Sequence, residues 1–469
     1  MSQSYLDLGF NSTEKEYQVE RLPLQGSLPG WLNGTLFRNG PGTLQVGKER
    51  FRHWFDGLPM LHKFTILNGE ISYTNKFLDT QSYRSAVNEN KIVYSEFATD
   101  PQWSLIDRVR NFFSPKITDS AKVNLTRIGE HYMALAETPI QVIYDPKTLK
   151  TQGTFSYEDN LVGQMTTVHP QYDRQTNRFY NLVTRFHQTS HYRIYELGDE
   201  LKPQKFASVS VKKPSYIHSF GMSENHFILA EFPLVVNSLA LLFWLKPFIE
   251  NYRWEPERGT KITLINRHNG KVEGRFETDP FFAFHHINAF EEGNILTIDL
   301  AAYQDASILQ AFYLETILEG AKPLPYGKLK RLRVPINGGQ VTTETLSDTC
   351  MELPNYDVMQ LGNDPDYRYI YAVSINPRTT ASFYNQIAKV DILGEQERSW
   401  YQPGCYPGEP VFVGRPKRKE EDDGVILSVV LDTERETSFL LVLEAKSLGE
   451  LARAEIPHPI LMGYHGAFF

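Results

Sequence analysis

Cysteine is scarce in this chain, which has two, Cys350 and Cys405, among 469 residues. Two cysteines cannot build a disulfide framework or a thiolate metal site. Because disulfides persist in oxidising compartments, their scarcity fits a reducing one, and we expect a cytoplasmic location. The first five residues, MSQSY, contain no basic segment followed by an apolar core, so we expect no signal peptide.

Long hydrophobic runs and basic clusters are also missing. The longest uncharged apolar stretch, 232–245, has 14 residues, and a membrane-spanning helix needs about 20. The net charge is -8. The short basic run at 415–419 is interrupted by Pro416 and followed by four acidic residues at 420–423, which indicates a solvated hairpin tip. Nucleic-acid binding requires basic clustering, so we expect no nucleic-acid partner.

Aromatic residues and turn formers are abundant. The chain has 29 Phe and 25 Tyr, which favour strands, and its 31 Gly and 27 Pro are scattered rather than gathered in linkers. Apolar runs end repeatedly in hairpin signals, such as 63–67 before Asn68-Gly69 and 261–265 before Asn269-Gly270. We therefore predict an all-β fold in one domain, 1–469, as a sandwich, barrel or propeller. The length suits about seven four-stranded blades.

Two insertions have helical, amphipathic spacing. The first spans 103–113 and places Trp103, Ile106 and Val109 on one face. The second spans 239–249, is apolar nearly all round and is flanked by basic residues. Such a helix is either buried or pressed against a membrane interface, and the pattern leaves both readings open.

Four of the 13 histidines stand out because each lies in or beside an apolar, aromatic, strand-like run. They are His169, His218, His285 and His465, separated by 49, 67 and 180 residues. They cannot share one helix, but they could converge if the blades of a propeller sent inner strands toward one axis. A single histidine is more often a surface or core residue than a ligand. Four converging neutral imidazoles would hold a metal, and on an octahedral metal they leave two positions open, which suits iron better than closed tetrahedral zinc.

Three glutamates lie in surroundings too apolar for a solvated surface: Glu137, Glu352 and Glu409. A buried carboxylate is costly without a partner. Histidines that bind a metal normally donate their second N–H to a carboxylate or carbonyl, so these glutamates could orient the ligands. The alternative is that each glutamate accepts from a backbone turn or pairs with an arginine.

At these residues the sequence resembles the carotenoid cleavage oxygenase family. The resemblance runs from about Gly26 to Phe469, and we expect a microbial member of the family. Its markers appear in order: 34–42 (GTLFRNGPG), 53–57 (HWFDG), the four histidine segments, 409–413 (EPVFV) and 464–466 (YHG). Any one marker is weak, whereas the whole set in this order over more than 400 residues is highly specific.

The resemblance implies a seven-bladed β-propeller with a helical cap over its top face. It also implies Fe(II) held by His169, His218, His285 and His465, with His285 rather than His286 as the ligand of that pair. The outer glutamates are then implied by position: Glu137 supports His218, Glu352 supports His285 and Glu409 supports His465. His169 is left without a carboxylate.

Family members cleave an olefinic bond with O2 and release two carbonyl products, without an organic cofactor or external reductant. The resemblance therefore implies a lipophilic polyene substrate, a carotenoid or apocarotenoid, in an apolar tunnel. We expect Trp54, Phe55, Phe282 and Phe284 to line this tunnel, and Val123 to screen an open metal position. Ala136 stands where stilbene-cleaving relatives carry lysine, which argues against a phenolic stilbene. The segment 51–57 is more similar to the central-cleaving, retinal-forming branch.

Family members also resemble peripheral membrane enzymes, so the resemblance favours membrane contact for both apolar insertions. The residues expected at this contact are Trp103, Phe112, Phe113, Leu241, Leu242, Phe243 and Trp244. Three other activities stay open: a retinoid isomerohydrolase on the same scaffold, a stilbene-cleaving dioxygenase and a non-catalytic polyene-binding propeller. A calcium-dependent propeller hydrolase would need clustered carboxylates on the axis, and the sequence has no such set.

Overall fold

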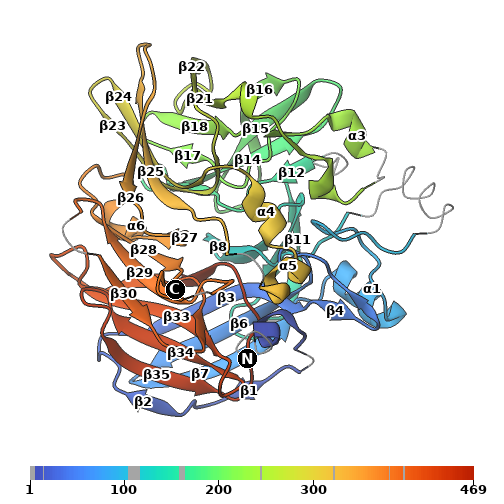
Figure 1. Ribbon diagram of the computed structural model, residues 1–469, viewed down its shortest axis with the longest axis vertical. Coiled ribbons are helices and arrows are strands. Elements are labelled where there is room, and N and C mark those ends of the chain that lie inside the picture. The colour runs from blue at the N-terminus through green and yellow to red at the C-terminus, as the bar shows by residue number, and fades with distance from the viewer. Residues whose placement is uncertain are drawn as a thin grey trace.

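Seven antiparallel β-sheets account for most of the chain in the computed structural model, which describes residues 6–13, 15–103, 117–157, 164–242, 246–320, 323–379, 381–394 and 397–469. Each sheet has four to six strands. The sheets follow one another in sequence like the blades of a propeller, and Figure 1 shows the change of colour from sheet to sheet. The predicted all-β, seven-bladed propeller is confirmed, whereas the single domain expected for 1–469 stays a prediction.

The strands of the first four sheets are given in their order within each sheet. The first contains β1 (Gln18–Val19), β7 (Glu70–Phe77), β6 (Leu58–Leu67), β3 (Gly34–Thr43) and β36 (Gly466–Phe468). The second contains β11 (Thr151–Ser156), β10 (Ile140–Tyr144), β9 (His131–Leu135) and β8 (Asn124–Ile128). The third contains β12 (Gln164–Thr166), β14 (Arg178–Arg185), β15 (Ser190–Leu197) and β16 (Gln204–Val211), with β13 (Gln171–Asp173) also paired to β14. The fourth contains β17 (Gly221–Met222), β18 (His226–Glu231), β21 (Thr260–Asn266) and β22 (Val272–Thr278).

The remaining sheets are built in the same way. The fifth contains β23 (Phe282–Glu292), β24 (Ile295–Tyr303), β25 (Lys328–Pro335) and β26 (Thr342–Ser347). The sixth contains β27 (Glu352–Asn355), β28 (Tyr369–Ser374), β29 (Gln386–Asp391) and β30 (Arg398–Tyr401). The seventh contains β2 (Leu24–Gly26), β35 (Glu450–Ile456), β34 (Thr437–Glu444), β33 (Gly424–Asp432) and β31 (Cys405–Pro407), with β32 (Val411–Gly414) also paired to β33. Two strand pairs stand apart: β4 (Gln45–Val46) with β5 (Glu49–Arg50), and β19 (Leu234–Val235) with β20 (Arg253–Trp254).

The hairpins form where the sequence predicts them. Asn68 and Gly69 join β6 to β7 with positive φ angles of 50° and 79°, the conformation that a tight hairpin turn requires and that Asn-Gly adopts readily. Asn269 and Gly270 lie in a longer turn between β21 and β22, in which Gly270 has a positive φ angle of 69°. Local turn chemistry therefore sets the register of these sheets.

The ring of sheets is closed by both ends of the chain. The C-terminal strand β36 pairs with β3 in the first sheet, with Phe37 opposite Ala467. The N-terminal strand β2 pairs with β35 in the seventh sheet, with Gln25 opposite Arg453. Because each of these sheets contains strands from both ends, closure carries the last residues of the chain to the inner side of the first sheet.

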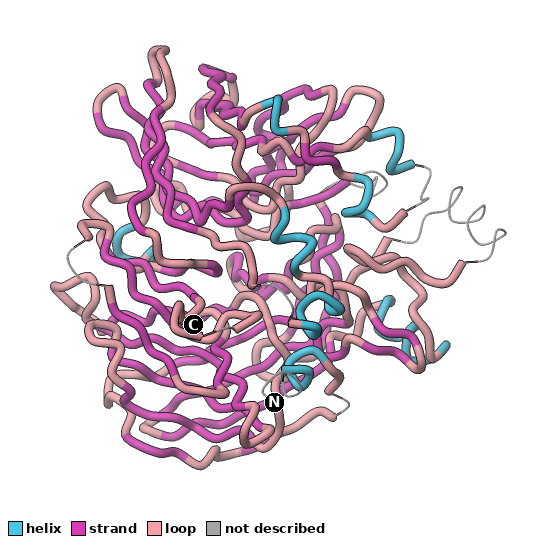
Figure 2. Tube along the Cα trace, in the orientation of Figure 1, coloured by secondary structure: helices cyan, strands magenta, loops and turns pink. Residues whose placement is uncertain are grey.

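Short helices gather on one side of the sheets. Figures 1 and 2 show α1 (Gln81–Glu89), α3 (Ser238–Leu242), α4 (Ser307–Ala311) and α5 (Leu314–Glu319) on that side. The other helical segments in the described ranges are η1 (Leu6–Phe10), η2 (Phe248–Asn251), η3 (Pro256–Arg258) and α6 (Val358–Leu361). None of the described helices has the length and apolar character needed to cross a bilayer.

The two predicted helical insertions have different outcomes. The first, 103–113, falls outside the described residues except for Trp103, which is half-buried. In the second, 239–249, α3 ends at Leu242 and η2 begins at Phe248, and 243–245 lie outside the described residues. The described part of the second insertion is therefore two short segments rather than one continuous helix.

Candidate metal centre

The four predicted histidines lie in or close to the inner strands of different sheets. His285 lies within β23, His465 directly precedes β36, and His169 and His218 flank the short strands β12 and β17. The inner strands β17, β23 and β27 contact one another in turn, and β36 contacts β8 and β32. This arrangement brings residues that are far apart in sequence to a common axis.

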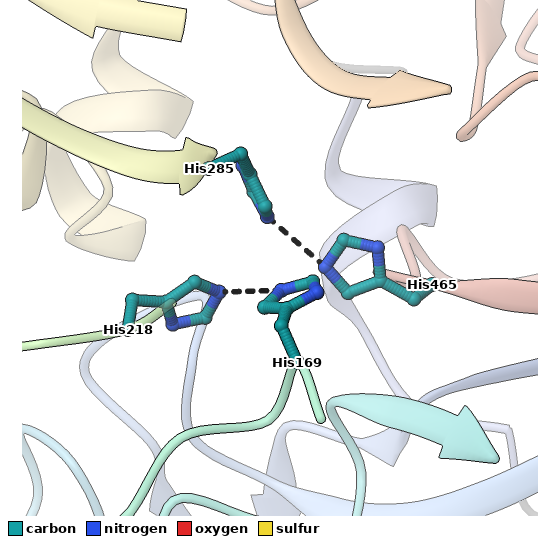
Figure 3. Close-up of side chains that lie close together, drawn as sticks. All are labelled: His169, His218, His285 and His465. Atoms are coloured by element: carbon teal, nitrogen blue, oxygen red, sulfur yellow. Dashed lines mark hydrogen bonds between the residues drawn. The ribbon is translucent and has the colours of Figure 1, made fainter. Parts of the chain in front are cut away.

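The imidazole rings face a single point, as Figure 3 shows. One ligand atom from each histidine lies within 4.8 Å of the other three. The Nε2 atoms of His169 and His218 are 3.3 Å apart, and those of His285 and His465 are 3.2 Å apart. Imidazole nitrogens that bind a metal at about 2.1 Å lie about 3 Å from their neighbours in an octahedral shell. The spacing therefore fits a metal ion held by four histidines.

Three carboxylates orient three of the rings. Glu137 Oε1 lies 2.7 Å from His218 Nδ1, and Glu409 Oε1 lies 2.7 Å from His465 Nδ1. Glu352 accepts from His285 Nδ1 in the same way. A ring that donates from Nδ1 keeps the lone pair of Nε2 free for a metal. These are the pairings that the family resemblance implies. They leave the Nε2 atoms of the three rings available to bind a cation.

The glutamates are held in turn by groups that the sequence reasoning missed. The Tyr216 hydroxyl donates to Glu137 Oε1 at 2.6 Å, and the Tyr303 hydroxyl donates to Glu352 Oε2 at 2.5 Å. Arg38, which is buried, donates to Glu409 Oε2 at 3.0 Å. Arg38 belongs to the 34–42 marker and Tyr216 precedes His218 by two residues, so both carried a positional signal, whereas Tyr303 carried none.

His169 has a different environment. Within the described residues no carboxylate contacts it, and the Asn124 amide nitrogen lies 3.3 Å from its Nδ1. That amide is oriented by the Val168 carbonyl, to which it donates at 2.8 Å. His169 also lines a second cavity, together with His286, which the other three histidines of the cluster do not line. His286 itself interacts with the Ser219 hydroxyl through Nδ1 at 2.8 Å and stays outside the four-histidine cluster.

Burial favours the neutral form of His169 and His218. It lowers the pKa of His169 well below its usual value, and it also lowers the pKa of His218 despite the opposing effect of the hydrogen bond that His218 donates to Glu137. Burial lowers the pKa of His286 to about 3. Neutral imidazoles are the form that binds metals, because protonation would occupy the lone pair.

A largely apolar cavity opens onto the histidine cluster. It is lined by His218, His285 and His465 and, on the sides, by aromatic rings from several segments. Four of the five predicted tunnel residues are on its wall: Trp54, Phe55, Phe284 and Val123. Phe282 is not among the lining residues. Its ring packs behind Phe284, with the ring centroids 4.8 Å apart, and also against Phe232 at 5.7 Å.

Ala136 also lines this cavity and is nearly fully buried. Its methyl group adds to the apolar wall at the position where a lysine would have introduced a charge. At this position, next to Glu137, the cavity wall therefore carries no positive charge.

The segment around α3 and η2 also reaches the cavity. Leu241, Lys246 and Phe248 are on its wall, and Leu239 on α3 is 47% exposed. Among the predicted membrane-contact residues, Phe112, Phe113, Phe243 and Trp244 lie outside the described residues, as does the side chain of Leu242. Trp103 is half-buried, and membrane contact at all seven positions stays a prediction.

Together, the fold and the centre define a β-propeller metalloprotein with four histidines on its axis and an apolar cavity beside them. Comparison with known proteins then specifies the family. A family model described as retinal pigment epithelial membrane protein matches residues 10–469. The human β,β-carotene 15,15′-dioxygenase is 33% identical over 525 aligned residues, covering 99% of this chain and 94% of that protein. A carotenoid isomerooxygenase of Galleria mellonella is 35% identical, covering 95% of this chain and 92% of that protein.

Solved structures give the same result. A cobalt-substituted apocarotenoid oxygenase from Synechocystis superposes with a TM-score of 0.87 at 26% identity, covering 100% of this chain and 98% of the other. The chain therefore belongs to the carotenoid cleavage oxygenase family and carries a four-histidine metal site. These relatives come from animals and a cyanobacterium, so the microbial source stays a prediction.

Proposed function

We propose that the protein is a non-haem Fe(II) dioxygenase that cleaves a conjugated C=C bond of a carotenoid or apocarotenoid with O2, giving two carbonyl products. The observation that carries this proposal is the four-histidine cluster at the base of an aromatic-lined cavity. Relatives named as β,β-carotene dioxygenase and apocarotenoid oxygenase support the substrate class. The similarity of 51–57 to the retinal-forming branch favours central cleavage.

The donor set favours iron over other metals. Imidazole binds several transition metals, but four neutral nitrogens leave the charge of the ion uncompensated and leave room for two further ligands on an octahedral ion. Bound Fe(II) would supply the redox chemistry that activates O2, which is spin-forbidden from reacting directly with a closed-shell alkene. His169, His218, His285 and His465 are the residues that would hold it.

The protein's own residues bind and orient the substrate. Phe55 lies on the cavity wall, with its ring centroid 5.6 Å from that of Phe284 and 5.7 Å from that of Tyr464. These rings present apolar surface to a flat conjugated chain and exclude water from the region beside the histidines. Val123 lies on the same wall, and its carbonyl accepts from the His465 backbone N–H at 3.2 Å. From this position on the wall, the Val123 side chain would limit access to a metal held by the four histidines.

Metal analysis and isotope labelling test this proposal together. The purified protein should contain about one iron per chain, and incubation with a carotenoid under ¹⁸O2 should give two aldehyde or ketone fragments that each contain label. Mass spectrometry over a panel of carotenoids, apocarotenals, a hydroxystilbene and a retinyl ester identifies the substrate. Conversion of the retinyl ester without incorporation of label would instead establish an isomerohydrolase. Labelled products from the hydroxystilbene and from no other substrate would establish a stilbene dioxygenase. Polyene binding without iron would establish a non-catalytic carrier.

We also propose that the protein works in the cytoplasm while peripherally attached to a membrane. A lipid-dissolved polyene has to enter the cavity from a bilayer, and α3 and η2 connect the cavity wall to the surface. Leu239 is exposed on α3, and the neighbouring Lys246 is exposed at the cavity and carries a charge that anionic lipid headgroups attract. A flotation assay with liposomes tests this attachment.

A further inference from the structure

A buried ion pair interrupts the apolar wall of the cavity. Lys122 Nζ lies 2.6 Å from Glu96 Oε2, and the two side chains are only 4% and 3% exposed. Both residues line the cavity that contains the histidine cluster. Placing two charges in such a site costs several kcal/mol of desolvation per ion before any pairing is counted. A cavity that bound only hydrocarbon would gain nothing from this cost.

The ion pair is the centre of a continuous polar cluster. The Thr118 hydroxyl donates to Glu96 Oε1 at 2.7 Å, and Lys122 Nζ also donates to the Ser120 hydroxyl at 3.2 Å. Thr118 and Ser120 are on the cavity wall as well. The cluster thus forms one polar patch within an otherwise largely apolar enclosure.

The ammonium group retains an unused donor. An ammonium has three N–H groups, and within the described residues Lys122 Nζ makes two hydrogen bonds, to Glu96 and Ser120. Each carboxylate oxygen of Glu96 already accepts one hydrogen bond, from Thr118 or from Lys122. The group left to recognise a ligand is therefore a cationic donor, and its natural partner is an oxygen that accepts, such as a carbonyl.

A purely structural carboxylate nearby shows a different pattern. Asp56 is fully buried, and its oxygens accept from the Ala98 and His53 backbone N–H groups and from the Thr99 hydroxyl, at 2.9, 3.1 and 2.6 Å. It is absent from the cavity wall. Asp56 thus already fixes the local chain path, whereas Glu96 and Lys122 face the space in which a ligand would lie.

The polar patch has a fixed position relative to the metal centre. Phe97, next to Glu96, has its ring centroid 5.3 Å from that of Phe55, and the Phe55 ring contacts Phe284 beside His285. Lys122 directly precedes Val123, whose carbonyl accepts from the His465 backbone. An end group held at this patch would therefore place a rigid polyene at a defined offset from the four histidines.

We propose that Glu96 and Lys122 form an end-group subsite that binds the carbonyl oxygen of an oxygen-terminated polyene, with Lys122 as the donor. The inference rests on the proposed function and deepens it, because it names the substrate as an aldehyde- or ketone-terminated apocarotenoid rather than a hydrocarbon carotenoid. Lys122 is in this view a specificity-determining residue, and it sets which bond lies beside the metal centre.

Two probes of matched conjugated length test the subsite: an apocarotenal and the corresponding hydrocarbon-terminated polyene. Wild-type protein should favour the aldehyde in kcat/KM. Lys122→Met should reduce the preference about 10- to 100-fold, the range expected for loss of one hydrogen bond to a charged group. Burial already raises the pKa of Glu96 to about 7, so this carboxyl group can take up a proton when its partner is removed. The double variant E96Q/K122M leaves no unpaired charge and should show the same loss.

A matched control separates recognition from loss of a buried ion pair. Lys389 on β29 and Asp422 in the loop before β33 form a similarly buried pair, 2.6 Å apart, and neither residue lines the cavity. Lys389→Met should lower thermal stability without changing the ratio of kcat/KM for the two probes. If Lys122→Met lowers kcat/KM equally for both probes, or leaves the preference for the aldehyde unchanged, the Glu96–Lys122 pair is structural and the inference is overturned.

A binding measurement keeps this test independent of catalysis. Quenching of tryptophan fluorescence by each probe reports polyene bound near Trp54 on the cavity wall. If no polyene is cleaved, the proposed function fails, but an aldehyde preference in binding that Lys122→Met abolishes still supports the subsite. Equal affinities for the two probes in the wild-type protein, or no binding of either, would overturn it.

Discussion

Replacing Glu352 by glutamine tests how strongly the outer carboxylates support the metal. Glu352 is 2% exposed and accepts from His285 Nδ1 and from the Tyr303 hydroxyl. Glutamine preserves the shape and one acceptor oxygen but removes the negative charge. A hydrogen bond to a charged group contributes about 1.5–3 kcal/mol and a neutral one about 1 kcal/mol. The difference predicts Fe(II) affinity about tenfold weaker than in the wild-type protein.

Replacing Glu352 by leucine gives the upper limit of the loss in Fe(II) affinity. The Tyr303 hydroxyl still has the Tyr384 hydroxyl 3.1 Å away, so the loss falls on His285, whose buried Nδ1–H has no other acceptor among the described residues. Leaving such a donor unsatisfied costs about 1–3 kcal/mol. Added to the lost charge, this predicts affinity about 100-fold weaker, at the upper end of the range known for second partners of metal-bound histidines.

The assay is anaerobic competition for Fe(II) with a coloured chelator, combined with thermal unfolding. Glu291→Gln is the control, because Glu291 also accepts from a histidine Nδ1, that of His226 at 3.0 Å, away from the metal centre. It should reduce stability and leave Fe(II) affinity unchanged. Wild-type affinity in Glu352→Gln, or an equal loss in Glu291→Gln, would refute the reasoning.

Three further predictions follow from other parts of the molecule. His465→Ala should abolish iron binding and polyene cleavage, as measured by iron per chain and by product analysis; retained iron would contradict the ligand assignment. Burial opposes the charged form of His226, but hydrogen bonds to two glutamates outweigh burial and raise its pKa. The stabilisation is therefore complete below about pH 6.5 and is lost as the pH rises through the raised folded-state pKa, so the Tm deficit of His226→Gln should shrink between pH 6 and 9. Leu239→Asp should weaken liposome binding about tenfold. Leu393 is also exposed, on the β29–β30 turn, and Leu393→Asp should leave liposome binding unchanged. Equal effects of the two substitutions would argue against attachment through α3.

Much of the fold could be predicted because its signals are local. Turns such as Asn68-Gly69 pair neighbouring strands, and alternating apolar residues decide which face of each sheet is buried. The helical insertion at 239–249 was predicted too long. A continuous apolar pattern does not reveal where a helix ends, and the described part consists of α3 and η2 as separate segments, with residues 246 and 247 outside both.

The candidate site could be predicted only in part. The aromatic, strand-like context of the four histidines and the apolar context of Glu137, Glu352 and Glu409 are visible in the sequence, and family resemblance supplied the pairing between them. Tyr303 and the pair formed by Glu96 and Lys122 were missed. Their side chains look ordinary in sequence, because what distinguishes them is burial and a partner from a distant segment.

The sequence by itself determined the strand-rich class, the candidate ligands and the family, since these depend on residue type and order. Tertiary structure decided how these groups meet and which further side chains join them. Closure of the ring through β36 brings His465 against His285, 180 residues away, with their Nε2 atoms 3.2 Å apart. The same packing brings Lys122 to Glu96 on the wall of a largely apolar cavity. Electrostatic interactions are stronger in an apolar environment than in water. Which side chains are buried in such an environment depends on the folded chain as a whole and not on any one segment.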